Sequence, residues 1–192
     1  MSTTIHFGFD LGDNKDARNI VERLHAKAKE LPFADVGDII DVSGEAADYE
    51  KRERDDPLKN ILFRAVGKGT SAETFDLRTP DRVIAFATSP GDGSESAVFG
   101  LAHDSQGWSW LNYCKTHFAK EFVEAHVLVI AMLDFASGLG VIQHVRDDSD
   151  YWINRSISEL LNHHSEMNSL MRKTADQLRA KGHEVTIGGR IE

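Results

Sequence analysis

The chain of 192 residues has one cysteine, four prolines, few aromatic residues and no long hydrophobic run. A single cysteine excludes a disulfide within the chain and is typical of a reducing compartment. The first residues lack the basic and apolar regions of a signal peptide. The strongest apolar run, 127–133, is far shorter than the ~20 residues that cross a bilayer. We therefore expect a cytoplasmic protein with no membrane partner.

Positive charge is also scarce. Lys and Arg number 22 against 31 Asp and Glu, which gives a formal net charge of -9. The longest basic run, 51–54, contains Glu53 and is flanked by other carboxylates, so no patch would attract a phosphate backbone. We expect no binding to nucleic acid. The acidic balance suits either simple solubility or a basic protein partner.

Hydrophobic periodicity predicts the class of fold. With 41% hydrophobic residues, the chain suffices for one globular domain over 1–192. Period-two and short apolar segments predict strands at 5–9, 36–42, 61–66, 83–88, 97–102, 141–145 and 185–187. Helical spacing predicts helices over 17–31, from near Thr116 to Ala136, and over 157–178, the last opened by a capping box from Ser156 to Glu159. This order predicts an α+β single domain, with a mostly antiparallel or mixed sheet of about five to seven strands packed against about three helices.

The most distinctive stretch is 88–117, which begins with a glycine-rich loop. Gly91-Asp92-Gly93 lacks the third glycine of a dinucleotide-binding loop, and a strand rather than a helix is predicted to follow it. A surface turn is the favoured interpretation. The alternative is that the glycines allow a ligand to approach Glu95 closely.

Metal and cofactor motifs are missing or incomplete. The carboxylates from Asp148 to Glu159 have part of the spacing of a calcium loop, but Trp152 and Ile153 occupy places that need an oxygen ligand and a glycine. No His-x-x-x-His or Cys-x-x-Cys pair is present. We expect no metal and no cofactor. His164 falls in the apolar stripe of the last helix, where a hydrogen-bonded core histidine is favoured over a titrating residue at a pocket floor.

An aromatic segment ends the distinctive stretch. In an extended strand, Trp108, Trp110, Asn112 and Cys114 point to one side. Core packing explains this pattern, and so does an aromatic ligand wall with Asn112 as a polar contact.

The cysteine has two interpretations. Cys114 precedes the predicted start of a helix near Thr116, adjoins Lys115 and lies three residues from His117. These positive influences would lower the thiol pKa and would favour a nucleophile with a histidine partner. A semi-buried structural cysteine is the favoured interpretation, because no family signature surrounds it.

Three functional hypotheses follow, and the sequence leaves open whether the protein is an enzyme. The first is a small-molecule-binding domain with a pocket near 88–117, in which Glu95 or His117 handles protons, Trp108 and Trp110 enclose the ligand, and Cys114 is nucleophile or wall. The second is an acidic inhibitor or immunity-type module that binds a basic protein without catalysis. The third is homodimerisation through the helix over 157–178, which has heptad-like spacing.

Overall fold

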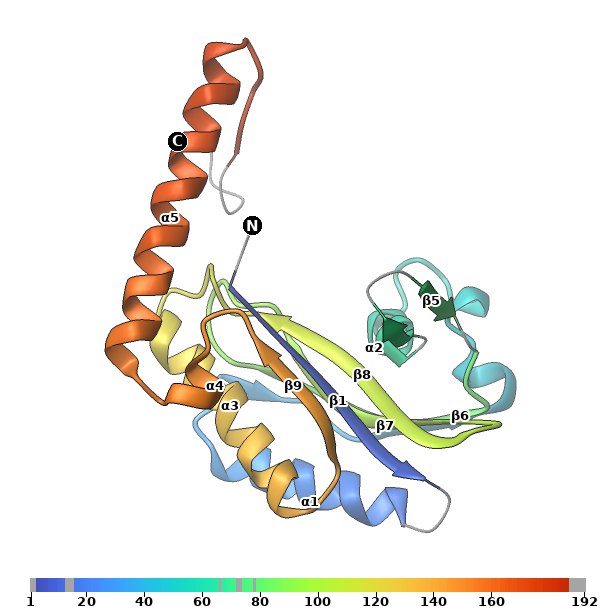
Figure 1. Ribbon diagram of the computed structural model, residues 1–192. Helices are drawn as coiled ribbons and strands as arrows, with labels where there is room; N and C mark the ends of the chain where they lie inside the picture. The colour runs from blue at the N-terminus through green and yellow to red at the C-terminus, as the bar shows by residue number, and fades with distance from the viewer. Residues whose placement is uncertain (1–2, 13–15, 66, 72–73, 78, 187–192) are drawn as a thin grey trace.

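The computed structural model describes residues 3–12, 16–65, 67–71, 74–77 and 79–186, with the backbone alone at 64, 67–71 and 74–77. Its main element is a seven-stranded sheet in which every pair of neighbouring strands is antiparallel (Figure 1). Helices pack on this sheet, so the α+β class predicted from the sequence is confirmed.

The strand order in the main sheet is β2-β6-β7-β8-β1-β9, and β3 also pairs with β6. The strands are β1 (Thr4–Gly12), β2 (Asp35–Val36), β3 (Ile40–Ser43), β6 (Arg82–Ser89), β7 (Ala97–Asp104), β8 (Gly107–Lys115) and β9 (Ile142–Asp147). A separate two-stranded sheet consists of β4 (Gly67–Ser71) and β5 (Thr74–Leu77). The strand predicted at 83–88 is confirmed as β6, which has neighbours on both sides and is followed along the chain by one of them, β7.

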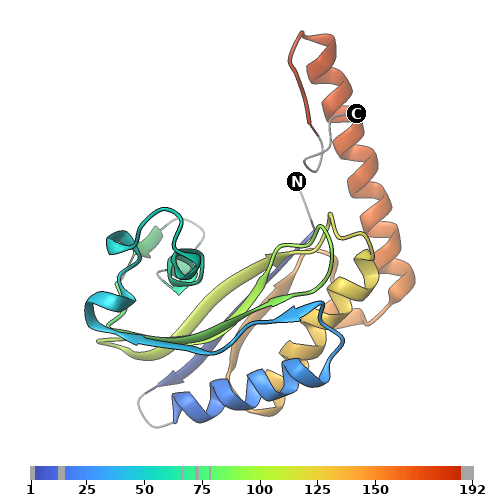
Figure 2. The ribbon, with the colours of Figure 1, turned by 180° about the vertical axis from the view of Figure 1, so that it is seen from behind.

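Two helices, α1 (Ala17–Glu30) and α3 (Phe122–Gly138), cover one face of the main sheet (Figure 2). The layer between them and the strands is aromatic. Phe99 of β7 lies 5.5 Å from Phe7 of β1 and 5.9 Å from Phe86 of β6, measured between ring centres. The α3 sequence is apolar on most sides, and its buried residues cover more than half of the helix circumference. This face holds the core.

The opposite face carries α2 (Pro57–Ala65), which packs over β6, β7 and β8. The sheet has small residues there. Gly100 of β7 lies so close to β6 that a Cβ atom would come within 2.4 Å of the Ala85 Cβ. Two short 3-10 helices, η1 (Gly44–Ala47) and η2 (Tyr49–Lys51), precede α2. Helix α2 and strand β5 lie together on this side of the sheet (Figure 1).

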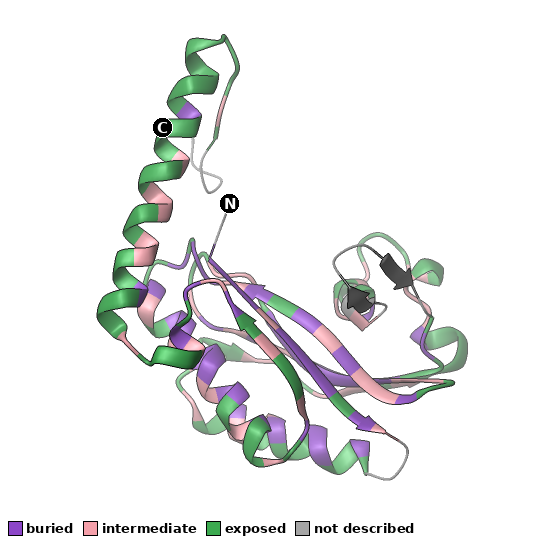
Figure 3. Cartoon of the chain, in the orientation of Figure 1, coloured by how far each residue is buried: buried purple, intermediate pink, exposed green. Residues whose placement is uncertain are grey.

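The last described helix extends away from the sheet. After the short α4 (Tyr151–Asn154), α5 (Ile157–Ala180) runs for 24 residues. Its predicted N-cap is confirmed, since the Ser156 side chain accepts a hydrogen bond from the Glu159 amide. Leu160 and Ala175 are its buried residues, and most of its surface is exposed (Figure 3).

The strand predicted at 61–66 is wrong, because 61–65 belong to α2 and 66 lies outside the described residues. Pro57 suits the first position of a helix, and the Asp56 side chain accepts a hydrogen bond from the Leu58 amide at 2.8 Å. Apolar residues at Leu58, Ile61, Leu62 and Ala65 then follow helical spacing. A short apolar run fits the periodicity of a strand and that of a helix. The helix-start signals at Asp56 and Pro57 identify this run as a helix.

Three other boundaries differ from the predictions. The strand expected over 36–42 is two short strands, β2 and β3, separated at Gly37, whose amide donates a hydrogen bond to the Ala87 carbonyl. Residues 67–70, for which no strand was predicted, lie in β4. The strand predicted at 185–187 is not formed at 185–186, and residue 187 lies outside the described residues.

The start of α3 also differs. The helix begins at Phe122 and not near Thr116, and tight turns occupy the residues between. The Ala119 amide donates to the Thr116 carbonyl, and the Lys120 amide donates to the Asp92 carbonyl. The second bond ties this turn to the glycine-rich loop.

Candidate functional site

The predicted site residues on strand β8 lie on one face of the sheet. Trp110, Asn112 and Cys114 pair with Phe9, Phe7 and Ile5 of β1, so they face the aromatic core beneath α1 and α3. They are 2%, 4% and 0% exposed, respectively. The Trp110 Nε1 donates to the Val98 carbonyl, and the Asn112 Oδ1 accepts from the Tyr113 amide. These three side chains line the protein interior.

Trp108 lies at the start of the same strand and is half-buried. Its ring centre is 5.1 Å from that of His103, and the Arg82 guanidinium lies 5.8 Å from the ring. Trp108 therefore lies at the edge of the core beside His103 and Arg82, whereas Trp110 lies inside it.

Cys114 is fully buried, and its thiol donates a hydrogen bond to the Glu95 carbonyl at 3.3 Å. Because α3 begins only at Phe122, Cys114 does not precede a helix start. Both nitrogens of His117 are engaged by residues other than Cys114. The predicted cysteine–histidine pair is not formed.

Burial makes the thiol slow to react. We expect native protein to be modified at Cys114 by Ellman's reagent at least about a hundredfold more slowly than unfolded protein, since the reagent must wait for local opening. One thiol should appear on adding denaturant. Rapid modification of the native protein would contradict the burial of Cys114.

His117 joins the body of the protein to α5. Its Nδ1 lies 3.1 Å from the Thr3 hydroxyl and its Nε2 lies 3.2 Å from the Asn168 Oδ1. The His164 Nε2 donates to the His117 carbonyl, and the His164 ring stacks on Phe122 with centres 3.9 Å apart. Burial, reinforced by His164, lowers the pKa of His117 to about 4. His164 is thus a hydrogen-bonded histidine between α5 and the body.

This histidine contact predicts a pH-dependent stability. Because His117 has a pKa near 4 when folded and about 6.5 when unfolded, the unfolded chain binds more protons between these values. The stabilising contribution of neutral His117 is therefore nearly complete above pH ~6.5 and falls by about 3 kcal/mol as the pH is lowered to 4. Urea unfolding at a series of pH values measures this loss. The His117→Gln variant should show a shallower dependence, and an unchanged slope would contradict the assignment.

The glycine-rich loop serves the fold. Gly93 has a φ of +80°, and a Cβ atom there would lie 2.3 Å from the Phe118 carbonyl oxygen. Glycine is thus required for the loop to pack against the turn at 118–120. This packing accounts for Gly93 without a ligand.

Glu95 lies on the other face of the sheet from Cys114, at a pocket of about 510 Å³ between α2 and strands β6, β7 and β8. The sheet side contributes small, apolar and polar side chains, and α2 contributes a mostly apolar wall. The lining residues are Pro57, Asn60, Ile61, Phe63, Ala87, Glu95, Ser96, Val98 and Tyr113. This volume lies within the 300–1,000 Å³ of small-molecule sites. We call it the α2 pocket.

Polar and aromatic groups form a row at the edge of the α2 pocket. The Lys115 Nζ lies 3.4 Å from the Glu95 Oε1 and 5.5 Å from the centre of the Tyr113 ring. The His6 ring of β1 is 6.0 Å from that of Tyr113. Burial lowers the pKa of His6, which favours its neutral form. The row thus offers a carboxylate, an ammonium group and a phenol next to an apolar wall.

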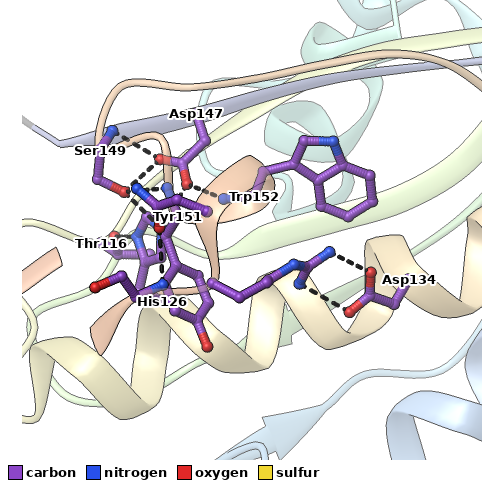
Figure 4. A network of polar contacts seen from close by, with 10 residues as sticks. Thr116, His126, Asp134, Asp147, Ser149, Tyr151 and Trp152 are labelled. Carbon is purple, nitrogen blue, oxygen red and sulfur yellow. Dashed lines mark hydrogen bonds and ion pairs between the residues drawn. The ribbon is translucent and has the colours of Figure 1, made fainter. Parts of the chain in front are cut away.

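A second polar cluster, which the sequence did not indicate as a unit, is buried between β8, α3 and β9 (Figure 4). The His126 Nε2 donates to the Asp147 Oδ2 at 3.1 Å, and the Thr116 hydroxyl lies 2.9 Å from the His126 Nδ1. Asp147 also accepts from the Ser149 hydroxyl and amide and from the Trp152 amide. The one sequence signal was a histidine within the apolar helix over 122–138.

This cluster has the residue types of a hydrolase triad without access for a substrate. The side chains of His126 and Asp147 are 0% and 1% exposed, and Thr116 is also fully buried. Burial alone would raise the pKa of Asp147, but hydrogen bonds from His126 and Ser149 outweigh it and hold the pKa at about 2. The arrangement joins α3, β9 and α4 and is structural.

Among the described residues, no three His, Cys, Asp or Glu side chains gather in a way that would hold a metal ion. In the same part of the chain, no helix is both long and apolar enough to span a membrane. Comparisons of the chain with protein-family models, with curated proteins and with solved structures found no match. The function must therefore be argued from the geometry of this chain.

Proposed function

We propose that the protein binds a small molecule in the α2 pocket without transforming it. The observation that carries the proposal is a pocket of ligand size with an apolar wall on α2 and the Glu95 carboxylate on the opposite side. Phe63, 58% exposed, and Tyr113, 37% exposed, lie on its border. Exposed aromatic side chains beside a pocket are suited to contact a ring.

The chemistry of the lining favours one class of ligand. Ile61, Phe63 and Val98 suit a compact apolar ring, whereas Glu95 and Ser96 suit a hydrogen-bond donor attached to it. The ligand that fits best is a ring that bears an amine or a hydroxyl group. The Lys115 ammonium beside Glu95 balances the charge, so the ligand need not be a strong cation.

Binding is favoured over catalysis because of where the reactive side chains lie. Cys114 faces the core, and His117 contacts α5. Among the described lining residues, Glu95 is the one carboxylate and none is a cysteine or histidine. Glu95 can orient a hydrogen-bond donor, but the described lining offers it no histidine or cysteine as a catalytic partner.

The acidic-module hypothesis has less support in the geometry. In the acidic segment 35–56, Asp41 is paired with Arg18 and Arg82, Glu45 with Lys51, and Asp56 with Arg52. These three of the nine carboxylates in the segment are balanced by neighbours in the same chain, which reduces the field available to a basic protein partner.

The test uses ligand-observed NMR with phenol, benzylamine and benzyl alcohol as probes. We expect weak binding of at least one probe to the native protein. Phe63→Ala should weaken it several-fold by removing part of the apolar wall, and Ala87→Met should weaken it by filling the pocket. Phe118→Ala is the matched control, because Phe118 is 41% exposed but does not line the pocket. Binding of none of the probes, or equal effects of the two Phe variants, would contradict the proposal.

A further inference from the structure

Helix α5 is a long surface element that contacts the other described elements mainly at α3 and α4. At ~1.5 Å per residue, its 24 residues span roughly 36 Å. Its first half contacts the body through Leu160, His164 and Asn168. Contacts of its second half include the following tail, such as the bond from Arg179 to the Val185 carbonyl. Helices owe most of their stability to packing against other elements. A helix as exposed as α5 is therefore suited to pack against a partner.

The charges of α5 are divided along its length. The half over 157–168 contains Glu159 and Glu166 and no Lys or Arg. The half over 169–180 contains three basic residues, Arg172, Lys173 and Arg179, against Asp176. A helix with one acidic and one basic half is complementary to a second copy of itself in the antiparallel orientation.

One face of α5 has the pattern that such a pair needs. Glu159, Glu166 and Lys173 recur every seven residues, and Leu170 lies between the last two on the same face. All four are exposed, and Leu170 is 41% exposed. By helical geometry this face lies nearly opposite Ala175, which is buried. Among the described residues, neither Glu166 nor Lys173 has an ion-pair partner.

We propose that two copies of the chain associate through antiparallel α5 helices, with Leu170 on the two-fold axis. Leu170 then contacts Leu170 of the second copy. Glu166, four residues before Leu170, lies beside Lys173 of the second copy, three residues after it. Glu159 lies beside Lys181. Because the body lies at one end of α5 (Figure 1), an antiparallel pair places the two bodies at opposite ends, where they do not collide.

The contact is small and mostly polar, so the dimer is weak and salt-dependent. The full chain is studied by sedimentation velocity over a hundredfold range of concentration. We expect the mass to approach twice that of the chain at high concentration, and Leu170→Asp to weaken association by more than about tenfold. A monomer at every concentration would overturn the proposal.

Charge exchange tests the orientation. Glu166→Lys places a new ammonium group beside Lys173 of the second copy at two symmetric sites and should weaken the dimer about tenfold. Lys173→Glu should act similarly, and the double variant should regain the native affinity within about threefold. Glu53→Lys, an exposed reversal outside α5, is the control. Because these side chains are exposed, thermal unfolding should be unchanged. Failure of the double variant to recover would overturn the antiparallel pairing.

Discussion

Replacing Asp147 with asparagine is expected to lower the free energy of unfolding by about 3–5 kcal/mol. The carboxylate accepts hydrogen bonds from His126, from the Ser149 hydroxyl and amide and from the Trp152 amide, and its side chain is 1% exposed. An asparagine side chain has one acceptor oxygen, and its NH2 group would face donors. Buried donors would then lose their partners, at a cost of about 1–3 kcal/mol each. Urea denaturation followed by circular dichroism measures the loss.

Asp134→Asn is the matched control for Asp147→Asn. Asp134 forms a two-pronged pair with Arg155, but the side chains are 51% and 40% exposed. Exposed pairs contribute about 0–1 kcal/mol, so this variant should be nearly as stable as the native protein. Equal losses for the two variants would show that burial does not distinguish the sites.

Replacing Gly100 with valine is expected to cost about 3 kcal/mol or to prevent folding. A Cβ atom at this position would lie 2.4 Å from the Ala85 Cβ and 2.6 Å from the Ile84 carbonyl oxygen. Backbone atoms of the paired strand β6 cannot move away as the end of a flexible side chain can. Because the α2 pocket is built on the same strands, ligand binding should be lost together with stability. Thermal unfolding and yield of folded protein measure the effect.

Gly138→Ala provides the comparison for Gly100. Gly138 ends α3, and a Cβ there would meet nothing within 4 Å. Alanine favours a helix over glycine by up to about 1 kcal/mol, so this variant should be equally or more stable than the native protein. A destabilised Gly138→Ala variant together with a stable Gly100→Val variant would contradict the packing assigned to the two glycines.

The elements with local signals were predicted from the sequence. Helix α1 has clear spacing, α5 has a cap at Ser156, and β6 and β7 are apolar segments joined by a polar loop. The strand predicted at 61–66 failed because an apolar segment of that length fits a strand and a helix equally well. The boundary errors at 36–42 and near Thr116 have a different cause. There, hydrogen bonds to distant residues, Ala87 and Asp92, set the conformation.

The site was predicted less well than the fold, for a physical reason. Alternation along β8 correctly placed Trp108, Trp110, Asn112 and Cys114 on one side of the strand. It does not say which side is covered by α1 and α3 and which by α2, because that depends on pairing with β1 and β7. Glu95 was selected as a candidate and does line the α2 pocket. Phe63 was not selected, because 61–66 was interpreted as a strand.

The His126 and Asp147 cluster was also not predicted from the sequence, because it depends on tertiary packing. Its members come from residues 116, 126, 147 and 149, which meet only when α3 packs against β9. A histidine in an apolar helix indicates a buried polar partner but not which one. Asp147 ends β9, and its bond to the Trp152 amide ties that strand to α4.

Chemical-shift mapping of the backbone amides during titration with benzylamine tests the central claim most directly. If the α2 pocket is the binding site, the largest changes should fall on residues 57–63, on Glu95 and Ser96, and on Tyr113. Amides near Cys114, His117 and the second half of α5 should change little. Changes centred on those residues, or no saturable change anywhere, would contradict a small-molecule site between α2 and the sheet.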